Sequence, residues 1–313
     1  MAPPRLLYLS RGHGYGHAAT DLEIIDALRR RGAEVVIASY GTGAEYYRER
    51  DVACTDLRID DVNDQGVDAA LRILAFLRRH ADADLVLAHE VFAAPRMCVE
   101  LGLRNVLMTH WFFSELGAPE RDRLLAVADE LVFVDFEAAH RVPAGFAHTV
   151  FAGAVARRFD GDRRAGREAL DFPDDRELVV LTTGAVTPYN EEHLRAVVDT
   201  VVRAWRRYRS RDGALVILSD VRPDVDDPSV RSVGRVRDPA PYYQAADVVV
   251  ANATFSTICT LARNDVPTVV VTGGRNPVDR LHADFFASTG HVRAVEVGAS
   301  AHLLWSAVEA VVT

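Results

Sequence analysis

Apolar and polar positions along the chain form two alternating patterns: short apolar runs, and longer segments with apolar residues at helical spacing. In the first half, the short runs predict buried strands at 6–10, 34–39, 85–88, 105–109, 131–134 and 149–151. The longer segments predict helices at 19–31 and 67–80, the second with Leu71, Leu74 and Leu77 on one face. Such alternation of strand and helix is typical of parallel α/β folds.

The same alternation restarts in the second half. Segment 157–167 is charged and contains glycine, and we interpret it as a linker. The apolar runs after it predict strands at 178–182, 214–218, 230–233, 248–251 and 268–271. Helices are predicted at 191–207, after Thr254, around 280–288 and at 301–312.

Two similar α/β halves are the organisation that this repeated pattern predicts. The chain has 313 residues, more than one hydrophobic core usually accommodates. We predict a Rossmann-like N-terminal domain at 1–156 and a Rossmann-like C-terminal domain at 157–313, facing each other across a cleft. One arrangement left open has the last helix packing back on the N-terminal domain.

Composition and charge narrow the class of protein. Hydrophobic residues make up 49% and charged residues 26%, which is ordinary for a soluble globular protein, and the net charge of −9 argues against a nucleic-acid partner. The chain has no lysine, which excludes Schiff-base chemistry and a P-loop lysine. Its three cysteines are widely spaced, so neither a zinc site nor a disulfide framework is expected. No signal sequence or membrane-length apolar run is seen, and a cytoplasmic location is expected.

A glycine-rich turn after the first predicted strand carries the first candidate site: His13, Gly14, Gly16 and His17. Glycines allow a sharp turn and close approach to a ligand, and the amides of the following helix favour an anion. Histidine can exchange a proton near neutral pH, although His17 capping the helix is the alternative. The spacing is not GxGxxG and no acidic residue closes the second strand, so no nicotinamide or flavin cofactor is expected.

A second candidate site follows the strand at 248–251. Its small and hydroxyl-bearing residues lead into a helix, where Ser256, Thr257 and exposed amides can bind pyrophosphate oxygens. An ordinary helix cap by Thr254 or Ser256 is the alternative. The candidate residues are Asn252, Ala253, Thr254, Ser256 and Thr257.

Two weaker candidates lie in the same half. Thr183 and Gly184 follow its first strand, where a hydroxyl and a glycine can face phosphates. Asp279 and His282 lie three residues apart at a helix start, where they can bind a sugar hydroxyl or a phosphate. A solvated helix start is the alternative for the second pair.

Residues after the other strands of the first half are predicted to line the edge where the glycine turn lies. Glu90 follows one strand and can orient His17 or bind a hydroxyl, while His110 and Trp111 follow the next. Aromatic rings there suit a small hydrophobic acceptor or a lipid. Core packing is the alternative for Trp111 and Phe112.

Taken together, these segments resemble the GT-B glycosyltransferases, most closely the branch of the peptidoglycan N-acetylglucosaminyltransferase. The turn ending in Gly16 and His17 is similar to that family's GGH element, and segment 151–157 to its GNPVR segment. The run from Asp247 through Thr257 to Pro267 is similar to its donor signature.

This resemblance implies a metal-independent, inverting glycosyltransferase of the hexosyltransferase type that needs no cofactor. The first domain would hold a small-molecule or lipid acceptor, and a lipid acceptor would bring peripheral contact with a membrane. The second domain would hold a nucleotide-diphosphate sugar. His17 matches the family's proton-handling position, so the resemblance implies that it is the general base; such bases typically contribute ~10²–10⁴-fold in rate.

The chain also departs from the family pattern. Thr260 stands where the family has a glutamate that grips the ribose, which puts a uridine nucleotide in doubt. Asp279 would repel phosphate unless Arg275 or Arg280 neutralises it. Two other functions stay open: a nucleotide-sugar hydrolase like that of pseudaminic acid biosynthesis, with water as the acceptor, and a non-catalytic binding or partner subunit.

Overall fold

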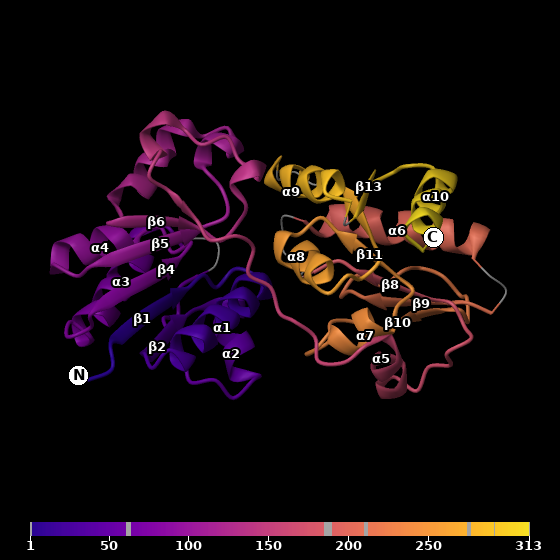
Figure 1. Ribbon diagram of the computed structural model, residues 1–313, viewed down its shortest axis with the longest axis horizontal. Helices are drawn as coiled ribbons and strands as arrows, with labels where there is room; N and C mark the ends of the chain where they lie inside the picture. The colour runs from indigo at the N-terminus through magenta and orange to yellow at the C-terminus, as the bar shows by residue number, and fades with distance from the viewer. Residues whose placement is uncertain are drawn as a thin grey trace. The chain divides into compact units, whose positions relative to one another are not determined.

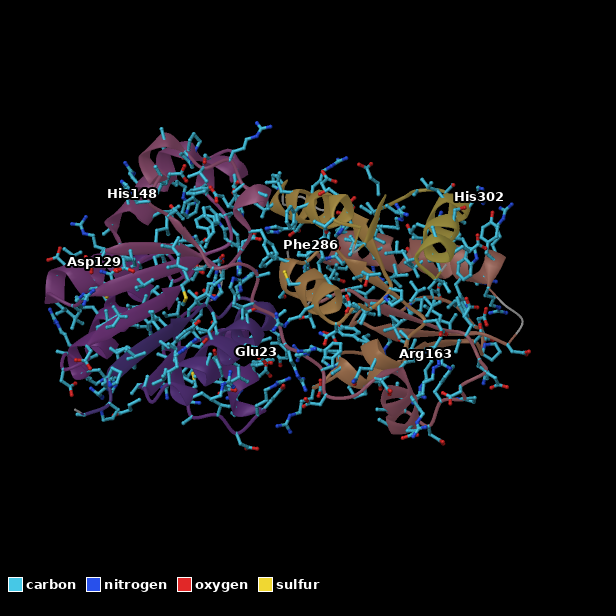
Figure 2. All side chains as sticks on the ribbon, in the orientation of Figure 1. Glu23, Asp129, His148, Arg163, Phe286 and His302 are labelled. Atoms are coloured by element: carbon cyan, nitrogen blue, oxygen red, sulfur yellow. The ribbon has the colours of Figure 1, made fainter. Side chains whose placement is uncertain are left out.

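The computed structural model describes residues 2–60, 64–184, 190–209, 212–273, 277–290 and 292–312. The chain divides into two compact units, Met1–Val155 and Ala156–Thr313 (Figure 1). Each unit has one parallel sheet with helices on both faces, and its side chains fill the space between helix and sheet (Figure 2). Charged side chains such as Asp129 and Arg163 are exposed. No helix among the described residues is long and apolar enough to cross a membrane.

The sheet of the first unit has seven strands in the order β3-β2-β1-β4-β5-β6-β7, and every neighbouring pair is parallel. Its central strands are buried on both faces, which explains their continuous apolar runs. The strands are β1 (Arg5–Ser10), β2 (Glu34–Ser39), β3 (Thr55–Asp56), β4 (Leu85–His89), β5 (Asn105–Thr109), β6 (Glu130–Phe133) and β7 (Val150–Phe151).

Two hydrophobic cores lie on the two faces of this sheet. Successive strand residues point to opposite sides of the sheet. Leu7 and Leu9 of β1 therefore pack with Phe76 on one face, while Leu6 and Tyr8 pack with the first two helices on the opposite face. The helices are α1 (Tyr15–Arg30), α2 (Gly41–Arg48), α3 (Val67–Arg79) and α4 (Ala94–Leu101). Short 3₁₀ helices follow at η2 (Phe113–Leu116), η3 (Pro119–Val127), η4 (Glu137–Ala139) and η5 (Ala144–Phe146).

The sheet of the second unit has six parallel strands in the order β10-β9-β8-β11-β12-β13. The strands are β8 (Leu178–Thr182), β9 (Ala214–Leu218), β10 (Val230–Ser232), β11 (Val248–Asn252), β12 (Thr268–Thr272) and β13 (Arg293–Glu296). The helices are α5 (Arg163–Ala169), α6 (Glu191–Tyr208), α7 (Ala240–Ala245), α8 (Phe255–Arg263), α9 (Pro277–Ser288) and α10 (Ala301–Val312). The last helix buries Leu304, Trp305 and Val308 in the core that α6 shares.

These elements confirm the predicted α/β class and correct several local assignments. Helix α1 begins at Tyr15, four residues before the predicted start, because Gly14 takes a positive φ of 75° and turns the chain directly into the helix. The predicted linker contains α5, which Asp162 caps by accepting from the amide of Ala165. The short helices α2, α4 and α7 and the strands β3 and β13 were not predicted, because short segments carry a weak periodic signal.

Candidate active site

The strand order of each sheet reverses at one point, and parallel α/β sheets bind ligands at the carboxyl ends of the strands beside that point. In the first unit the reversal lies between β1 and β4, and in the second between β8 and β11. The candidate residues that directly follow β1, β4, β8 and β11 therefore lie at the expected edge of their own sheet.

The glycine turn of the first unit is held against the start of α2. Thr42 Oγ1 donates to the carbonyl of Gly12 at 2.6 Å and accepts from the amide of Gly14 at 2.8 Å. A Cβ atom at Gly12 would lie 2.2 Å from the carbonyl oxygen of Tyr40, so only glycine fits there. This contact fixes where α1 begins and hence where His17 points.

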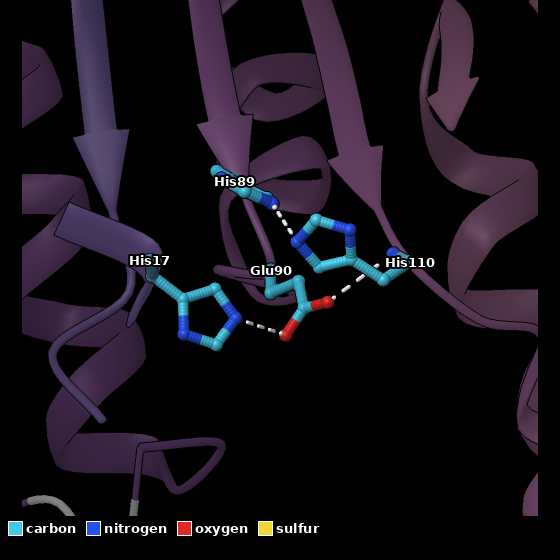
Figure 3. A group of neighbouring side chains, drawn as sticks. All are labelled: His17, His89, Glu90 and His110. Atoms are coloured by element: carbon cyan, nitrogen blue, oxygen red, sulfur yellow. Dashed lines mark hydrogen bonds and ion pairs between the residues drawn. The ribbon is translucent and has the colours of Figure 1, made fainter. Parts of the chain in front are cut away.

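His17 lies in the first turn of α1 and faces Glu90, which follows β4 (Figure 3). Nε2 of His17 lies 2.7 Å from Oε2 of Glu90. Among the described residues, no side chain caps α1, so the alternative role of His17 as a cap is not what the structure has. The side chain of His17 is 16% exposed, whereas that of Glu90 is fully buried.

Glu90 is held in a strained and strongly polar setting. Its φ of 54° lies in the left-handed region, and of the five described non-glycine residues with positive φ it alone is buried. Burial opposes ionisation, but His17, together with His110 and Arg11, outweighs it and holds the pKa of Glu90 well below its usual range. Arg11 Nη1 donates to Oε2 at 3.0 Å, and the amide of His110 donates to Oε1 at 3.3 Å. Glu90 is therefore an ionised, oriented carboxylate.

This arrangement decides which nitrogen of His17 can accept a proton. The carboxylate of Glu90 can only accept, so Nε2 carries the hydrogen and the lone pair of the neutral ring is on Nδ1. Nδ1 lies 3.3 Å from the carbonyl oxygen of His13. After a proton transfer, both N–H groups of His17 have acceptors, which stabilises the charged ring.

A chain of buried polar groups continues behind this pair. Tyr8 donates to Asp21 at 2.7 Å, Asp21 contacts Nδ1 of His89, and Nε2 of His89 lies 3.0 Å from Nε2 of His110. Burial lowers the pKa of His89, but the contact with Asp21 outweighs burial and raises this pKa above its usual value. Burial and the neighbouring His89 lower the pKa of His110 well below its usual value. His89 is thus the proton donor in the contact between the two rings.

The aromatic residues after β5 contact the core of the first unit. Trp111 is partly buried and packed against this core, and its ring centroid lies 6.4 Å from that of His110. Phe112 is fully buried, and its ring centroid lies 4.4 Å from that of Phe133, so Phe112 packs in the core. His13 is half-buried, and burial, Arg11 and His17 lower its pKa.

In the second unit, the turns after β8 and β11 lie side by side. Thr183 Oγ1 donates to Ser219 Oγ at 2.7 Å, which places its hydroxyl beside the end of β9. A Cβ atom at Gly184 would lie 3.7 Å from the Cγ2 atom of Thr254, so the two turns are in contact. Residue 185, the last of the predicted turn, is outside the described residues.

The start of α8 is the second candidate site. Thr254 stands at the cap position, its amide donates to the carbonyl of Asn252 at 2.7 Å, and its Oγ1 donates to Thr257 Oγ1 at 2.9 Å. No described side chain caps the helix, so the described side chains leave the amide of Ser256 uncapped. Asn252 Oδ1 accepts from Nε2 of His193 in the first turn of α6 at 2.8 Å.

The start of α9 carries the last two candidate residues, Asp279 and His282. The sequence predicts that Asp279 repels phosphate unless Arg275 or Arg280 neutralises it. Arg280 donates to Glu296 at 2.8 Å, and Arg275 lies outside the described part of the chain. Burial raises the pKa of Asp279 to about 7. His282 is buried with its ring centroid 4.3 Å from that of Phe255, so a solvated helix start is wrong for it.

A surface hollow of about 510 Å³ lies elsewhere in the second unit, beside the residues that precede β11 and β12. Two of its charged groups pair with each other: Arg163 donates to Asp247 at 2.7 Å. Because parallel sheets bind ligands at the opposite, carboxyl end, this hollow is not the candidate site.

Asp21 and Arg11 belong to the polar network of the candidate site but were not among the residues predicted from the sequence. Asp21 is four residues after His17, a spacing that places both side chains on one face of α1 and is visible in the sequence. Arg11 lies inside the glycine turn. The pairing of Asn252 with His193 had no local signal, because the two residues are 59 positions apart.

No protein-family model matches the sequence, and no curated protein matches it either. Solved structures match over its whole length. The glycotransferase of kitacinnamycin is 19% identical at a TM-score of 0.70, covering 100% of this chain and 91% of that one. MurG of Acinetobacter baumannii is 15% identical at a TM-score of 0.66, covering 99% of this chain and 91% of that one. A putative UDP-N-acetylglucosamine 2-epimerase of Listeria monocytogenes is 13% identical at a TM-score of 0.67, covering 100% of this chain and 86% of that one.

The matched structures run through both units, from the first strand to the last helix. This chain has the GT-B fold. The predicted fold class and the predicted resemblance to glycosyltransferases of this fold, including the MurG branch, are confirmed. The same fold occurs in an epimerase, so the reaction has to be argued from the side chains at the site.

Proposed function

We propose that this GT-B chain is an inverting glycosyltransferase that moves a sugar from a nucleotide diphosphate to a small-molecule or lipid acceptor. The contact between His17 and Glu90 carries the proposal. It supports the proposal because an imidazole and a buried carboxylate meet beside the strand-order reversal of the first sheet, where a ligand is expected.

His17 is the proposed general base. Its Nδ1 takes the proton of an acceptor hydroxyl, and the hydroxyl oxygen then forms the bond to the anomeric carbon as the bond to the diphosphate breaks. Glu90 holds Nε2–H and stabilises the imidazolium that forms, which is the reason to keep a carboxylate with a lowered pKa beside it. The first unit therefore binds the acceptor in this proposal.

The second unit is the proposed donor domain. The uncapped first turn of α8 offers amides to the diphosphate, and the hydroxyls of Thr183 and Ser256 lie in the turns at the same sheet edge. Asp279, with a pKa near 7, can bind a sugar hydroxyl as donor or acceptor. Thr260 donates to the carbonyl of Ser256 at 2.8 Å, so a charged ribose grip is absent at that position.

The test measures nucleoside diphosphate release from a panel of nucleotide sugars, with and without hydroxyl acceptors. His17→Ala should lower turnover by ~10²–10⁴-fold while the thermal shift given by the matching nucleoside diphosphate is unchanged. Glu90→Gln should also lower turnover, because a neutral amide cannot stabilise the imidazolium. The matched control is His148→Ala, since His148 is exposed and should leave both measurements unchanged.

Three outcomes would contradict the proposal. Undiminished turnover in His17→Ala removes the base. Sugar release at the same rate without any acceptor assigns a hydrolase instead. Nucleotide binding without turnover of any sugar assigns a binding subunit.

A further inference from the structure

Three imidazole nitrogens and one carboxylate oxygen converge at the carboxyl edge of the first sheet (Figure 3). They belong to His17, His89, His110 and Glu90, and all four atoms lie within 4.8 Å of one another. Nε2 is the nitrogen of each ring in the close contacts within this group. The two closest pairs are 2.7 Å for His17 and Glu90 and 3.0 Å for His89 and His110. The sequence predicted no metal, because the three cysteines lack the spacing of a zinc site and the family resemblance implies a metal-independent reaction.

The outer nitrogens of two of these rings already have acceptors. Nδ1 of His89 contacts the carboxylate of Asp21, and Nδ1 of His17 lies 3.3 Å from the carbonyl of His13. Histidines that bind metals usually donate this second N–H to a carboxylate or a carbonyl, which directs the other nitrogen at the ion. The same pattern thus directs both Nε2 atoms at the common centre.

The spacing of the four atoms is close to that of a tetrahedral site. Metal bonds of about 2.0–2.1 Å place neighbouring ligand atoms about 3.3 Å apart. The two close pairs would open by about 0.5 Å, and the widest pair would close by about 1.5 Å or less, which side-chain rotation can supply.

Charge also leaves room for a divalent cation. Asp21, Glu90 and Asp64 are three carboxylates bonded into this cluster, and Arg11 is the cation that bonds two of them. These four groups carry a net charge of −2, which is costly in a buried site, and the second proton that His89 holds when it donates to both Asp21 and His110 offsets half of it. One divalent ion that displaces this proton would balance the whole charge of the four groups.

We propose that His17, His89, Glu90 and His110 bind one divalent transition-metal ion. Three imidazoles and one carboxylate suit Zn²⁺ or Co²⁺, whereas Mg²⁺ prefers oxygen ligands and octahedral geometry. A bound ion occupies Nε2 of His17 and leaves the hydrogen on Nδ1, so the ring has no lone pair for a substrate. The ion therefore inhibits turnover; this consequence alone rests on the proposed function.

The experiment uses the full chain, freed of metal with a chelator and then equilibrated with Zn²⁺. Elemental analysis after removal of loosely bound metal should find about one zinc per chain. Titration with Co²⁺ should develop the intense visible bands of a four-coordinate site, and excess Mg²⁺ should not suppress them. His17→Gln and His110→Gln should each weaken the Co²⁺ affinity at least 10-fold, and Asp21→Asn by about 10–100-fold.

The control is His148→Gln, which alters an exposed histidine of the same unit and should bind the metal as the wild type does (Figure 2). Retention of one zinc in both His17→Gln and His110→Gln, with native circular dichroism, would overturn the site. So would the absence of bound zinc in the wild type. Binding is measured without substrate, so a chain that binds zinc but transfers no sugar refutes the proposed function and supports the metal site.

Discussion

Replacing Gly12 with alanine should destabilise the first unit far more than the same change at Gly14. A methyl at Gly12 would lie 2.2 Å from the carbonyl oxygen of Tyr40, where ordinary contact begins at 3.4 Å. That carbonyl accepts from the amide of Ala44 at 3.1 Å, and the Tyr40 ring is buried, so neither can retreat by the required ~1 Å without breaking packing. Overpacking of this kind costs about 3 kcal/mol.

Gly14 supplies the contrast. A methyl there would meet nothing within 4 Å, so the cost is that of the positive φ of 75° alone, about 1 kcal/mol. Gly145 is the control, because it has open space and no positive φ, and its alanine variant should change stability by less than about 0.5 kcal/mol.

Urea unfolding followed by circular dichroism, fitted with one transition for each unit, gives the three free energies of unfolding. The expected order of loss is Gly12→Ala, then Gly14→Ala, then Gly145→Ala. Equal losses at Gly12 and Gly14 would refute the argument that close contact, rather than backbone conformation, requires glycine at position 12. The transition of the second unit should not move in any variant.

Three other changes test the charged groups. Burial lowers the pKa of His140, but hydrogen bonds to Asp135 and Glu115 outweigh burial and raise this pKa to about 9. The contribution of His140 to stability is therefore complete below about pH 6.5 and is lost as the pH rises through 9. Urea unfolding of His140→Asn should not show that loss. Arg167→Met removes the guanidinium donor of three carbonyls and of the Asp247 carboxylate, which keeps the amide of Leu178, and should lower the free energy of unfolding by about 3 kcal/mol. An unchanged midpoint of urea unfolding would contradict this. Ionisation of Asp279 near pH 7 should weaken nucleoside diphosphate binding as the pH rises, and calorimetry on Asp279→Asn should find no such dependence.

The sequence alone determined the class of fold and the positions of its longest elements. Continuous apolar runs and a period of 3.6 residues are local properties, so buried strands such as β5 and β11 and the long helix α6 were predicted almost to their ends. Strands that end beside hydroxyls or histidines also predicted which edge of each sheet carries polar groups. Short elements were missed, because a few residues define no period.

Only the tertiary structure decided which of those polar groups meet. Glu90 reaches His17 from 73 positions away because β1 and β4 pair in parallel, with Ser10 opposite His89. The same pairing brings Asp21 to His89 across 68 positions. The proton on Nε2 of His17, the ionised state of Glu90 and the convergence of ring nitrogens all follow from contacts between distant segments, and a local pattern carries no information about those contacts.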